Sequence, residues 1–249
     1  MSDHYNQPEL AALYDDENVW DASSDFYRDL ALRSGAKTLL DLGCGTGLLT
    51  RGIVEAIDGS GVGIDPATPM LEVARRKTRG ERVEWLEGDA RSVRLDREFD
   101  LIIMTGNAFQ AFLTEADQVA LFRTAAAHLA PGGRFAFESR NPAKQEWREW
   151  VPGPASFRVQ ETVAYGPVEI WNDARMNADR ILDVEEHYRI LGSGKSLRSD
   201  FRLRFSSPEE IWDAMMPAGL AVEHCYGDYD CQPFTPAARE IVIVARLIA

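Results

Sequence analysis

The chain has 249 residues, enough for one large domain with a substantial core. Apolar residues make up 45% and charged residues 27%, which is the ordinary usage of a globular protein and excludes a disordered or fibrous chain. Forty acidic residues against 27 basic ones leave a formal net charge of −13. This balance disfavours a nucleic-acid backbone or an anionic membrane as partner.

The cysteines and the apolar runs indicate the cellular location of the protein. Cys44, Cys225 and Cys231 are too few for a disulfide framework, and they lack the paired Cys-x-x-Cys spacing of a structural zinc site, so no metal is expected. The opening sequence MSDHYNQPEL has neither the basic nor the apolar part of a secretory signal. The longest apolar run, near residues 241–248, is too short to span a bilayer. We therefore expect a cytoplasmic protein.

The first 140 residues predict an α/β fold. Residues 1–35 have a helical pattern, and from residue 37 short β-rich runs alternate with amphipathic stretches. The expected strands are Thr38–Leu42, Gly61–Asp65, Arg82–Leu86, Asp100–Met104 and Arg134–Glu138. The expected helices are Leu48–Ala56, Met70–Lys77 and Ala116–Leu129. This alternation predicts a mainly parallel sheet with helices on both faces, whose strands all end along one ligand-binding edge.

Between Phe157 and Phe205 the pattern changes to the two-residue period of half-buried strands. Apolar and polar residues alternate over residues 159–165, 182–190 and 201–205, with turn signals between these runs. We therefore expect an inserted antiparallel sheet of three or four strands.

The α/β pattern then resumes to the end of the chain. A helix is expected over Ser207–Ala218, capped by Ser207, followed by strands at Leu220–Tyr226 and Glu240–Leu247. The expected organisation is thus a helical lid at 1–35, a core made of 36–140 and 206–249, and an insertion at 141–205.

A glycine-rich loop follows the first expected strand, with the sequence Asp41-Leu42-Gly43-Cys44-Gly45-Thr46-Gly47. Glycines allow the backbone to turn sharply and to approach a ligand without Cβ atoms in the way. The dinucleotide fingerprint GxGxxG requires a glycine three positions after the second one, and this chain has Leu48 there. The loop therefore fits a nicotinamide-dependent oxidoreductase poorly.

The pattern Asp-x-Gly-x-Gly-x-Gly instead resembles the first motif of class I S-adenosylmethionine-dependent methyltransferases. Further segments agree with this family in order along the chain. They are Asp65 at the end of the second strand, Met70 in the next helix, Gly88-Asp89-Ala90, Thr105-Gly106-Asn107 after the fourth strand, and the turn Leu129-Ala130-Pro131-Gly132-Gly133. The resemblance covers roughly residues 14–139 and 207–247. It implies a doubly wound, seven-stranded, Rossmann-like sheet.

The resemblance also implies a cofactor, S-adenosyl-L-methionine, with S-adenosyl-L-homocysteine as product. It places an acid on the ribose hydroxyls (Asp65), an apolar side chain on the adenine (Met70) and Asp89 at the adenine edge. The positions predicted to bind the cofactor are Tyr14, Asp41, Gly43, Cys44, Gly45, Asp65, Met70, Asp89, Ala90, Thr105 and Gln110.

Several of these positions have a structural alternative. Asp65 could simply cap the following helix, Asp89 could belong to a turn, and Met70 could be core. Tyr14 could pack without covering a ligand. No basic residue lies close before Cys44, which disfavours a reactive thiol there.

The methyl acceptor and the catalytic residues are less defined. Methyl transfer from a sulfonium is an in-line displacement, which needs a base only if the acceptor must lose a proton. Each histidine that could act has a structural explanation, so no catalytic residue is assigned. The other candidates for contact with the acceptor are His128, His187, His224, Asn107, Phe109, Gln110, Trp147, Trp150 and the acidic-aromatic cluster Tyr226, Asp228, Tyr229 and Asp230.

The expected function is methyl transfer to a nitrogen or oxygen atom of a small molecule. The insertion resembles the acceptor-covering insertions of small-molecule methyltransferases, and a homodimer surface is the alternative left open. Methylation of DNA bases is disfavoured, because Thr105-Gly106-Asn107-Ala108 stands where such enzymes have (D/N/S)-P-P-(Y/F). A protein that binds the cofactor without catalysis, and less so an oxidoreductase, remain as alternatives.

Overall fold

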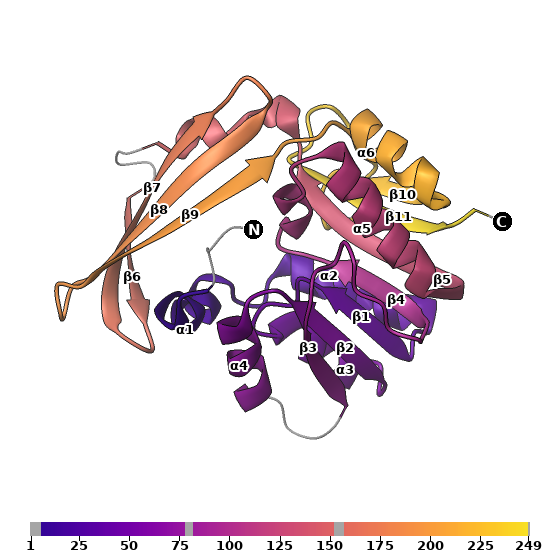
Figure 1. Cartoon of the computed structure of the whole chain (residues 1–249), viewed down its shortest axis with the longest axis horizontal. Coiled ribbons are helices and arrows are strands. Elements are labelled where there is room, and N and C mark those ends of the chain that lie inside the picture. Colours follow the sequence, from indigo (N-terminus) through magenta and orange to yellow (C-terminus); the bar gives the residue numbers. More distant parts are fainter. Residues whose placement is uncertain (1–5, 78–81, 152–156, 249) are drawn as a thin grey trace.

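The computed structural model describes residues 6–77, 82–151 and 157–248. In this part of the chain a seven-stranded sheet has the order β10-β11-β5-β4-β1-β2-β3 (Figure 1). The last strand, β11, runs antiparallel to both of its neighbours, and β1 to β5 run parallel to one another. The strands are β1 (Thr38–Leu42), β2 (Ser60–Asp65), β3 (Val83–Glu87), β4 (Phe99–Met104), β5 (Leu129–Arg140), β10 (Leu220–Tyr226) and β11 (Glu240–Leu247). The predicted seven-stranded, mainly parallel sheet is confirmed.

Helices cover both faces of this sheet. On one face, α2 (Ala22–Ser34) and α3 (Leu48–Ala56) bury Tyr27 and Ile53 against β4 and β11. On the other face, α5 (Glu115–His128) and α6 (Pro208–Met215) bury Phe122 against a stack of phenylalanines from β5. The predicted cap of α6 is present, since Ser207 and Glu210 form a reciprocal capping box.

The remaining elements lie near the carboxyl ends of the parallel strands or after α6. One is an α-helix, α4 (Thr68–Lys77), which follows β2. The others are the 3₁₀ turns η1 (Ala108–Ala111), η2 (Pro142–Lys144), η3 (Glu146–Glu149) and η4 (Met216–Ala218).

The insertion forms a separate antiparallel sheet in the order β6-β7-β8-β9, as expected. Its strands are β6 (Arg158–Thr162), β7 (Gly166–Met176), β8 (Ile181–Ile190) and β9 (Ser196–Arg204). The strand expected over 159–165 ends at Thr162, because the chain turns there and continues as β7, which the sequence analysis did not predict. In Figure 1 this sheet overhangs α1 at one side of the molecule.

The first helix, α1 (Pro8–Glu17), joins the inserted sheet to the core. Leu10 and Leu13 are buried against apolar side chains of β7, β8 and β9, while Ala11 packs with Met70 of α4. By contrast, α2 packs on the core sheet. The division at residue 35 therefore stays a prediction, and α1 is the part of that segment that contacts both the inserted sheet and helix α4 of the core. In the described ranges, no helix has the length and apolar character needed to cross a membrane.

Candidate functional site

The glycine loop lies at the carboxyl end of β1 and is fixed to β2. Gly43, Gly45 and Gly47 have φ angles of +85°, +54° and +71°, a region that favours glycine. The backbone N–H groups of Gly43 and Cys44 both donate to the carbonyl oxygen of Ile64, at 2.7 and 3.0 Å. The loop is thus held in a turn in which an L side chain is strained.

Asp65 connects this loop to the start of α4. One carboxylate oxygen accepts from the N–H of Gly45 and the other from the N–H of Ala67, both at 2.8 Å. The side chain is buried, and burial raises the pKa of its carboxyl. The capping alternative is therefore real, and the ribose contact stays a prediction.

Asp41 carries a buried carboxylate with an unfilled hydrogen-bonding position. Its Oδ2 accepts from the Thr50 hydroxyl at 2.5 Å, whereas its Oδ1 is buried with no partner. Burial, with a smaller contribution from the charges of Asp65 and Glu138, raises the pKa of Asp41 to about 7. A ligand that donates a hydrogen bond, above all a cationic one, would complete this site.

Tyr14 and Met70 lie over the glycine loop. A Cβ atom added at Gly45 would meet Met70 Cε at 3.3 Å and Tyr14 Cε1 at 3.6 Å, and one at Gly106 would lie 3.9 Å from the Tyr14 hydroxyl. Burial and the negative charges of Asp65 and Asp41 raise the pKa of Tyr14. The structure thus brings Tyr14, Asp41, Gly45, Asp65 and Met70 together.

Other predicted positions are engaged with protein groups. The carboxylate of Asp89 pairs with the guanidinium of Arg91, at 2.6 Å for its shortest contact, and this pairing outweighs partial burial and lowers the pKa of Asp89. Ala90 is buried beside it, and Thr105 is half-buried at the end of β4. Burial raises the pKa of the Cys44 thiol well above its usual range, which argues against a nucleophilic thiolate.

Gln110 lies in η1 with both ends of its amide occupied. Its oxygen accepts from Arg140 at 2.8 Å and its nitrogen donates to the carbonyl of Arg204 at 3.3 Å. The side chain is fully buried and links η1 to β5 and β9. It therefore shapes the turn after β4, which leaves a direct ligand contact as a prediction without support from this geometry.

Two glutamates at the same sheet edge were not singled out from the sequence. Glu138 of β5 is 1% exposed; one oxygen accepts from the Asn107 N–H at 2.7 Å and the other from the Tyr27 hydroxyl. Glu240 begins β11, and its buried Oε2 has no partner. Burial raises the pKa of each carboxyl to about 7. Strand alternation could have placed Glu138 beside the buried Ala136, but not beside Tyr27.

The histidines have structural surroundings. Both ring nitrogens of His128 are hydrogen-bonded, to the Leu95 N–H at 2.8 Å and to the Thr124 carbonyl at 2.7 Å. His187 stacks on Trp171 with ring centroids 5.1 Å apart, and His224 is exposed beside Tyr226. No histidine in the described ranges is thus placed with the buried carboxylates above.

Two of the aromatic candidates pack against other aromatic side chains, and a third lies against Arg140. Tyr229 packs on Phe26 of α2 at 6.1 Å, and Trp147 packs edge-on against Phe205 at 4.5 Å. Trp150 lies 4.9 Å from the guanidinium carbon of Arg140, beside the glutamate-bearing ends of β5 and β11.

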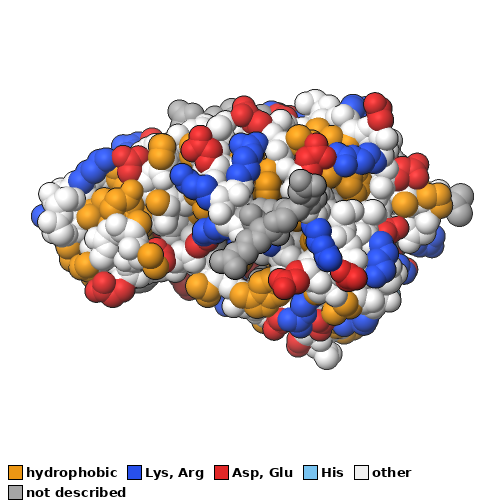
Figure 2. Space-filling view, turned by 90° about the horizontal axis from the view of Figure 1, so that it is seen from below, with side chains coloured by type: hydrophobic (Ala, Val, Ile, Leu, Met, Phe, Trp, Pro, Cys, Tyr) orange, Lys and Arg blue, Asp and Glu red, His pale blue; other side chains and the backbone are white. Residues whose placement is uncertain are grey.

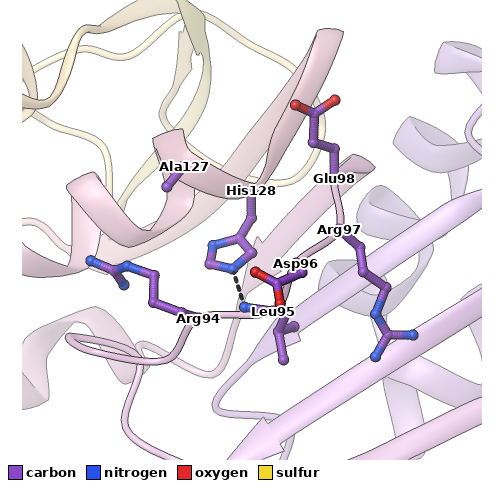
Figure 3. A pocket seen from close by; sticks show the side chains of 7 residues that line it. All are labelled: Arg94, Leu95, Asp96, Arg97, Glu98, Ala127 and His128. Atoms are coloured by element: carbon purple, nitrogen blue, oxygen red, sulfur yellow. Dashed lines mark hydrogen bonds between the residues drawn. The ribbon is translucent and has the colours of Figure 1, made fainter.

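A hollow at the opposite edge of the sheet is less suited to a cofactor. It is lined by the segment before β4 and by the end of α5 (Figure 3). The His128 ring is held by the Leu95 N–H in this view, while Arg94, Arg97 and Glu98 point away from it. The predicted ligand positions all lie at the carboxyl edge, so we do not assign a ligand to this hollow.

Comparisons with known proteins indicate the family that this chain resembles. A family model described as a methyltransferase domain matches residues 39–133. The cypemycin N-terminal methyltransferase of a Streptomyces species is 28% identical over 208 residues, which cover 84% of this chain and 82% of that protein. These matches support a class I S-adenosylmethionine-dependent methyltransferase.

Two further proteins are similar to this chain over most of its length. A dTDP-3-amino-3,6-dideoxy-alpha-D-glucopyranose N,N-dimethyltransferase from Streptomyces fradiae is 24% identical over 88% of the chain and 86% of its own length. An S-adenosylmethionine-dependent methyltransferase from Clostridium acetobutylicum superposes with a TM-score of 0.82 at 19% identity, over 97% and 98% of the two chains, which shows a shared fold. The predicted family, fold and donor are therefore confirmed.

The buried carboxylates predict how the stability of the ligand-free methyltransferase depends on pH. Asp41, Glu138 and Glu240 have pKa values of about 7 when folded, above their ordinary values of 3.8 or 4.5. Between these limits the folded state binds more protons than the unfolded state, so the free energy of unfolding falls as pH rises. We expect the melting temperature to be several degrees lower at pH 8 than at pH 5.5, since about 1 kcal/mol moves it by roughly 2–4 °C at this chain length.

Differential scanning calorimetry at the two pH values checks this expectation. In Asp41→Asn, which removes one of the three ionisable groups, the fall should be smaller. A melting temperature of the wild type that rises from pH 5.5 to pH 8 would contradict the assignment of these carboxyls as buried and destabilising when charged.

Proposed function

We propose that this methyltransferase moves a methyl group from S-adenosylmethionine to a nitrogen or oxygen atom of a small molecule, bound between the sheet edge and the insertion. One observation carries the location of the donor. The buried carboxylates of Asp41, Asp65 and Glu138 form no ion pair with a lysine or arginine in the described part of the chain. Buried carboxylates are stabilised by nearby positive charge, and the donor carries both an ammonium group and a sulfonium.

The residues around these carboxylates fit the donor. The unpartnered Oδ1 of Asp41 would receive its ammonium group, and the side-chain-free loop leaves room for its amino-acid portion. Asp65 would hold the ribose with lone pairs not used by Gly45 and Ala67, and Met70 would lie against the adenine. The full proposed set is Tyr14, Asp41, Gly43, Cys44, Gly45, Asp65, Met70, Asp89, Ala90 and Thr105, with Gln110 supporting it through η1.

When bound, the donor supplies a methyl group on a positively charged sulfur. The protein would hold the acceptor in line with this group and exclude water, which supplies much of the acceleration in a displacement of this kind. In the described structure α1 is suited to close the site, since the hydroxyl of Thr46 donates to its Asp15 and the Val163 N–H of the insertion donates to its Asp16. We therefore propose α1 as the lid and the insertion as the acceptor cover.

We propose further that the partner is a small molecule and not a nucleic acid. The face shown in Figure 2 intersperses basic and acidic side chains instead of gathering basic ones, which agrees with the net charge of −13. A homodimer through the insertion is proposed from the exposed apolar side chains of Phe157, Val159 and Val163. A cytoplasmic location is proposed from the free Cys44, Cys225 and Cys231.

Incubation with methyl-labelled S-adenosylmethionine tests the activity. The acceptors should be a panel of small amines and their hydroxyl and carboxylate analogues, with S-adenosylhomocysteine binding measured in parallel by calorimetry. We expect tight binding of S-adenosylhomocysteine and transfer of label to at least one acceptor class. Tight NAD binding with no S-adenosylhomocysteine binding would contradict the proposal.

A further inference from the structure

Unpartnered buried polar atoms gather at one edge of the core sheet. In the described part of the chain they are Asp41 Oδ1, Asn107 Oδ1, Ser139 Oγ and Glu240 Oε2. They lie at the carboxyl ends of β1, β4 and β5 and at the start of β11, which pairs with the end of β5. Asp41 is 2% exposed and Ser139 is fully buried. Because a buried polar atom without a partner is costly, this gathering indicates that a bound ligand completes it.

The chemistry of these atoms defines the ligand. An ionised carboxylate and an amide oxygen only accept hydrogen bonds, so Asp41, Asn107 and Glu240 each lack a donor. In the proposed donor complex Asp41 is completed by the ammonium group of S-adenosylmethionine. Asn107 follows β4, and Glu240 begins β11 opposite Arg140 at the end of β5. In the proposed complex the acceptor lies on this side of the donor. The missing partner of Asn107 and Glu240 is therefore an N–H or O–H donor on the acceptor.

Charge distinguishes between an N–H group and an O–H group as this hydrogen-bond donor. Glu138 lies beside both residues: its Oε1 accepts from the Asn107 N–H, and the register of β5 with β11 places it diagonally from Glu240 on one face. The cation nearest to them, Arg140, donates to Gln110 and lies against Trp150. Three glutamates, Glu138, Glu240 and Glu146, thus face two arginines, Arg140 and Arg239, and Arg239 is already paired with Glu146 at 2.8 Å. A site with this excess of negative charge favours a cationic nitrogen over a neutral hydroxyl and rejects a carboxylate.

We propose that the acceptor is a primary or secondary amine whose nitrogen is held by Asn107 Oδ1 and the carboxylate of Glu240. This inference rests on the proposed function and narrows its acceptor class. An amine arrives protonated, and its proton passes to the Glu240 carboxylate, which frees the nitrogen lone pair. That pair forms the new N–C bond while the C–S bond breaks and its electrons stay on sulfur. The proton on Glu240 is then released to water.

The test uses the full chain and the variants Glu240→Gln and Glu55→Gln. Glutamine keeps the size of the side chain and removes its charge and its capacity as a base. Glu55 is an exposed glutamate near the end of α3 and serves as the matched control. Activity is measured as kcat/KM for a panel of primary amines and the alcohols of the same carbon skeletons.

A second measurement needs no acceptor. In sinefungin a carbon replaces the sulfur of the donor and carries an amino group in place of the methyl group, so it presents N–H groups toward the acceptor side. We measure the dissociation constants of sinefungin and of S-adenosylhomocysteine by calorimetry for each protein. Their ratio reports the acceptor side of the site, whereas binding of S-adenosylhomocysteine reports the donor side.

We expect methyl transfer to amines in preference to alcohols, and a loss of kcat/KM of about tenfold or more in Glu240→Gln. The advantage of sinefungin over S-adenosylhomocysteine should fall by a similar factor, while binding of S-adenosylhomocysteine stays unchanged. Glu55→Gln should behave as the wild type. Transfer to alcohols instead of amines, or a sinefungin ratio that is the same in Glu240→Gln and wild type, overturns this inference and leaves the proposed function intact. Failure of the wild type to bind S-adenosylhomocysteine overturns both.

Discussion

Replacing Asp65 by alanine is expected to weaken binding of S-adenosylhomocysteine by about 10–150-fold, the range for losing hydrogen bonds to a charged group. Two losses contribute. The ribose hydroxyls would lose their carboxylate, and the N–H groups of Gly45 and Ala67 would lose acceptors that now lie at 2.8 Å. Because the Gly45 N–H belongs to the loop itself, the variant should bind less tightly even to ligands that lack a ribose. Isothermal titration calorimetry on the folded variant measures this effect.

Two further variants isolate the cause. Asp65→Asn keeps the shape and one acceptor oxygen, so its affinity should lie between those of the wild type and the alanine variant. Asp96→Ala removes an exposed aspartate at the opposite edge, beside the hollow of Figure 3, and should leave affinity unchanged. Unchanged affinity in folded Asp65→Ala would show that Asp65 only caps α4.

Replacing Gly47 by alanine should lower the free energy of unfolding by about 2–5 kcal/mol, the sum of overpacking and of a left-handed backbone. A Cβ atom at this position would lie 2.2 Å from Trp85 Cη2, and two more atoms of the same ring lie within 2.9 Å. The φ angle of +71° adds strain for any L side chain. Urea unfolding followed by circular dichroism measures the loss.

Gly132→Ala is the matched control, because Gly132 has a similar φ of +81° but nothing within 4 Å of an added Cβ. This variant should lower the free energy of unfolding only by the cost of the left-handed backbone, about 1–2 kcal/mol. Adding Trp85→Leu to Gly47→Ala removes the clashing ring, so the double variant should lose less stability than the two single losses together. Equal losses for Gly47→Ala and Gly132→Ala would disprove the role of the Trp85 contact.

Local patterns in the sequence were sufficient for much of the fold. Strands β1, β2, β4, β10 and β11 could be predicted from short apolar runs. The turn of the glycine loop could be predicted because its backbone has positive φ angles, which favour glycine. Strand β7 was missed because its second half reads Asn172-Asp173, which has low strand propensity. These residues are held because residues 168–176 of β7 pair with β8, a tertiary effect that no local window contains.

The sequence points to residues for the proposed donor side of the site and to fewer for the proposed acceptor side. Asp41, Asp65 and Met70 occupy fixed places relative to the glycine loop, so a motif locates them. Glu138 is defined by Tyr27, which is 111 residues away, and Glu240 by the end of β5 across an antiparallel pair. The link of α1 to the insertion depends likewise on contacts between distant segments, such as Asp16 with Val163. Such long-range pairings arise only when the sheets assemble.

A crystal structure of the full chain with S-adenosylhomocysteine bound tests the central claim most directly. The account predicts the ligand across the carboxyl ends of β1 and β2, with its ribose hydroxyls on Asp65, its adenine against Met70 and its ammonium group on Asp41 Oδ1. A ligand bound elsewhere, for example in the hollow beside His128, or bound at this edge without contact to Asp65, would contradict it.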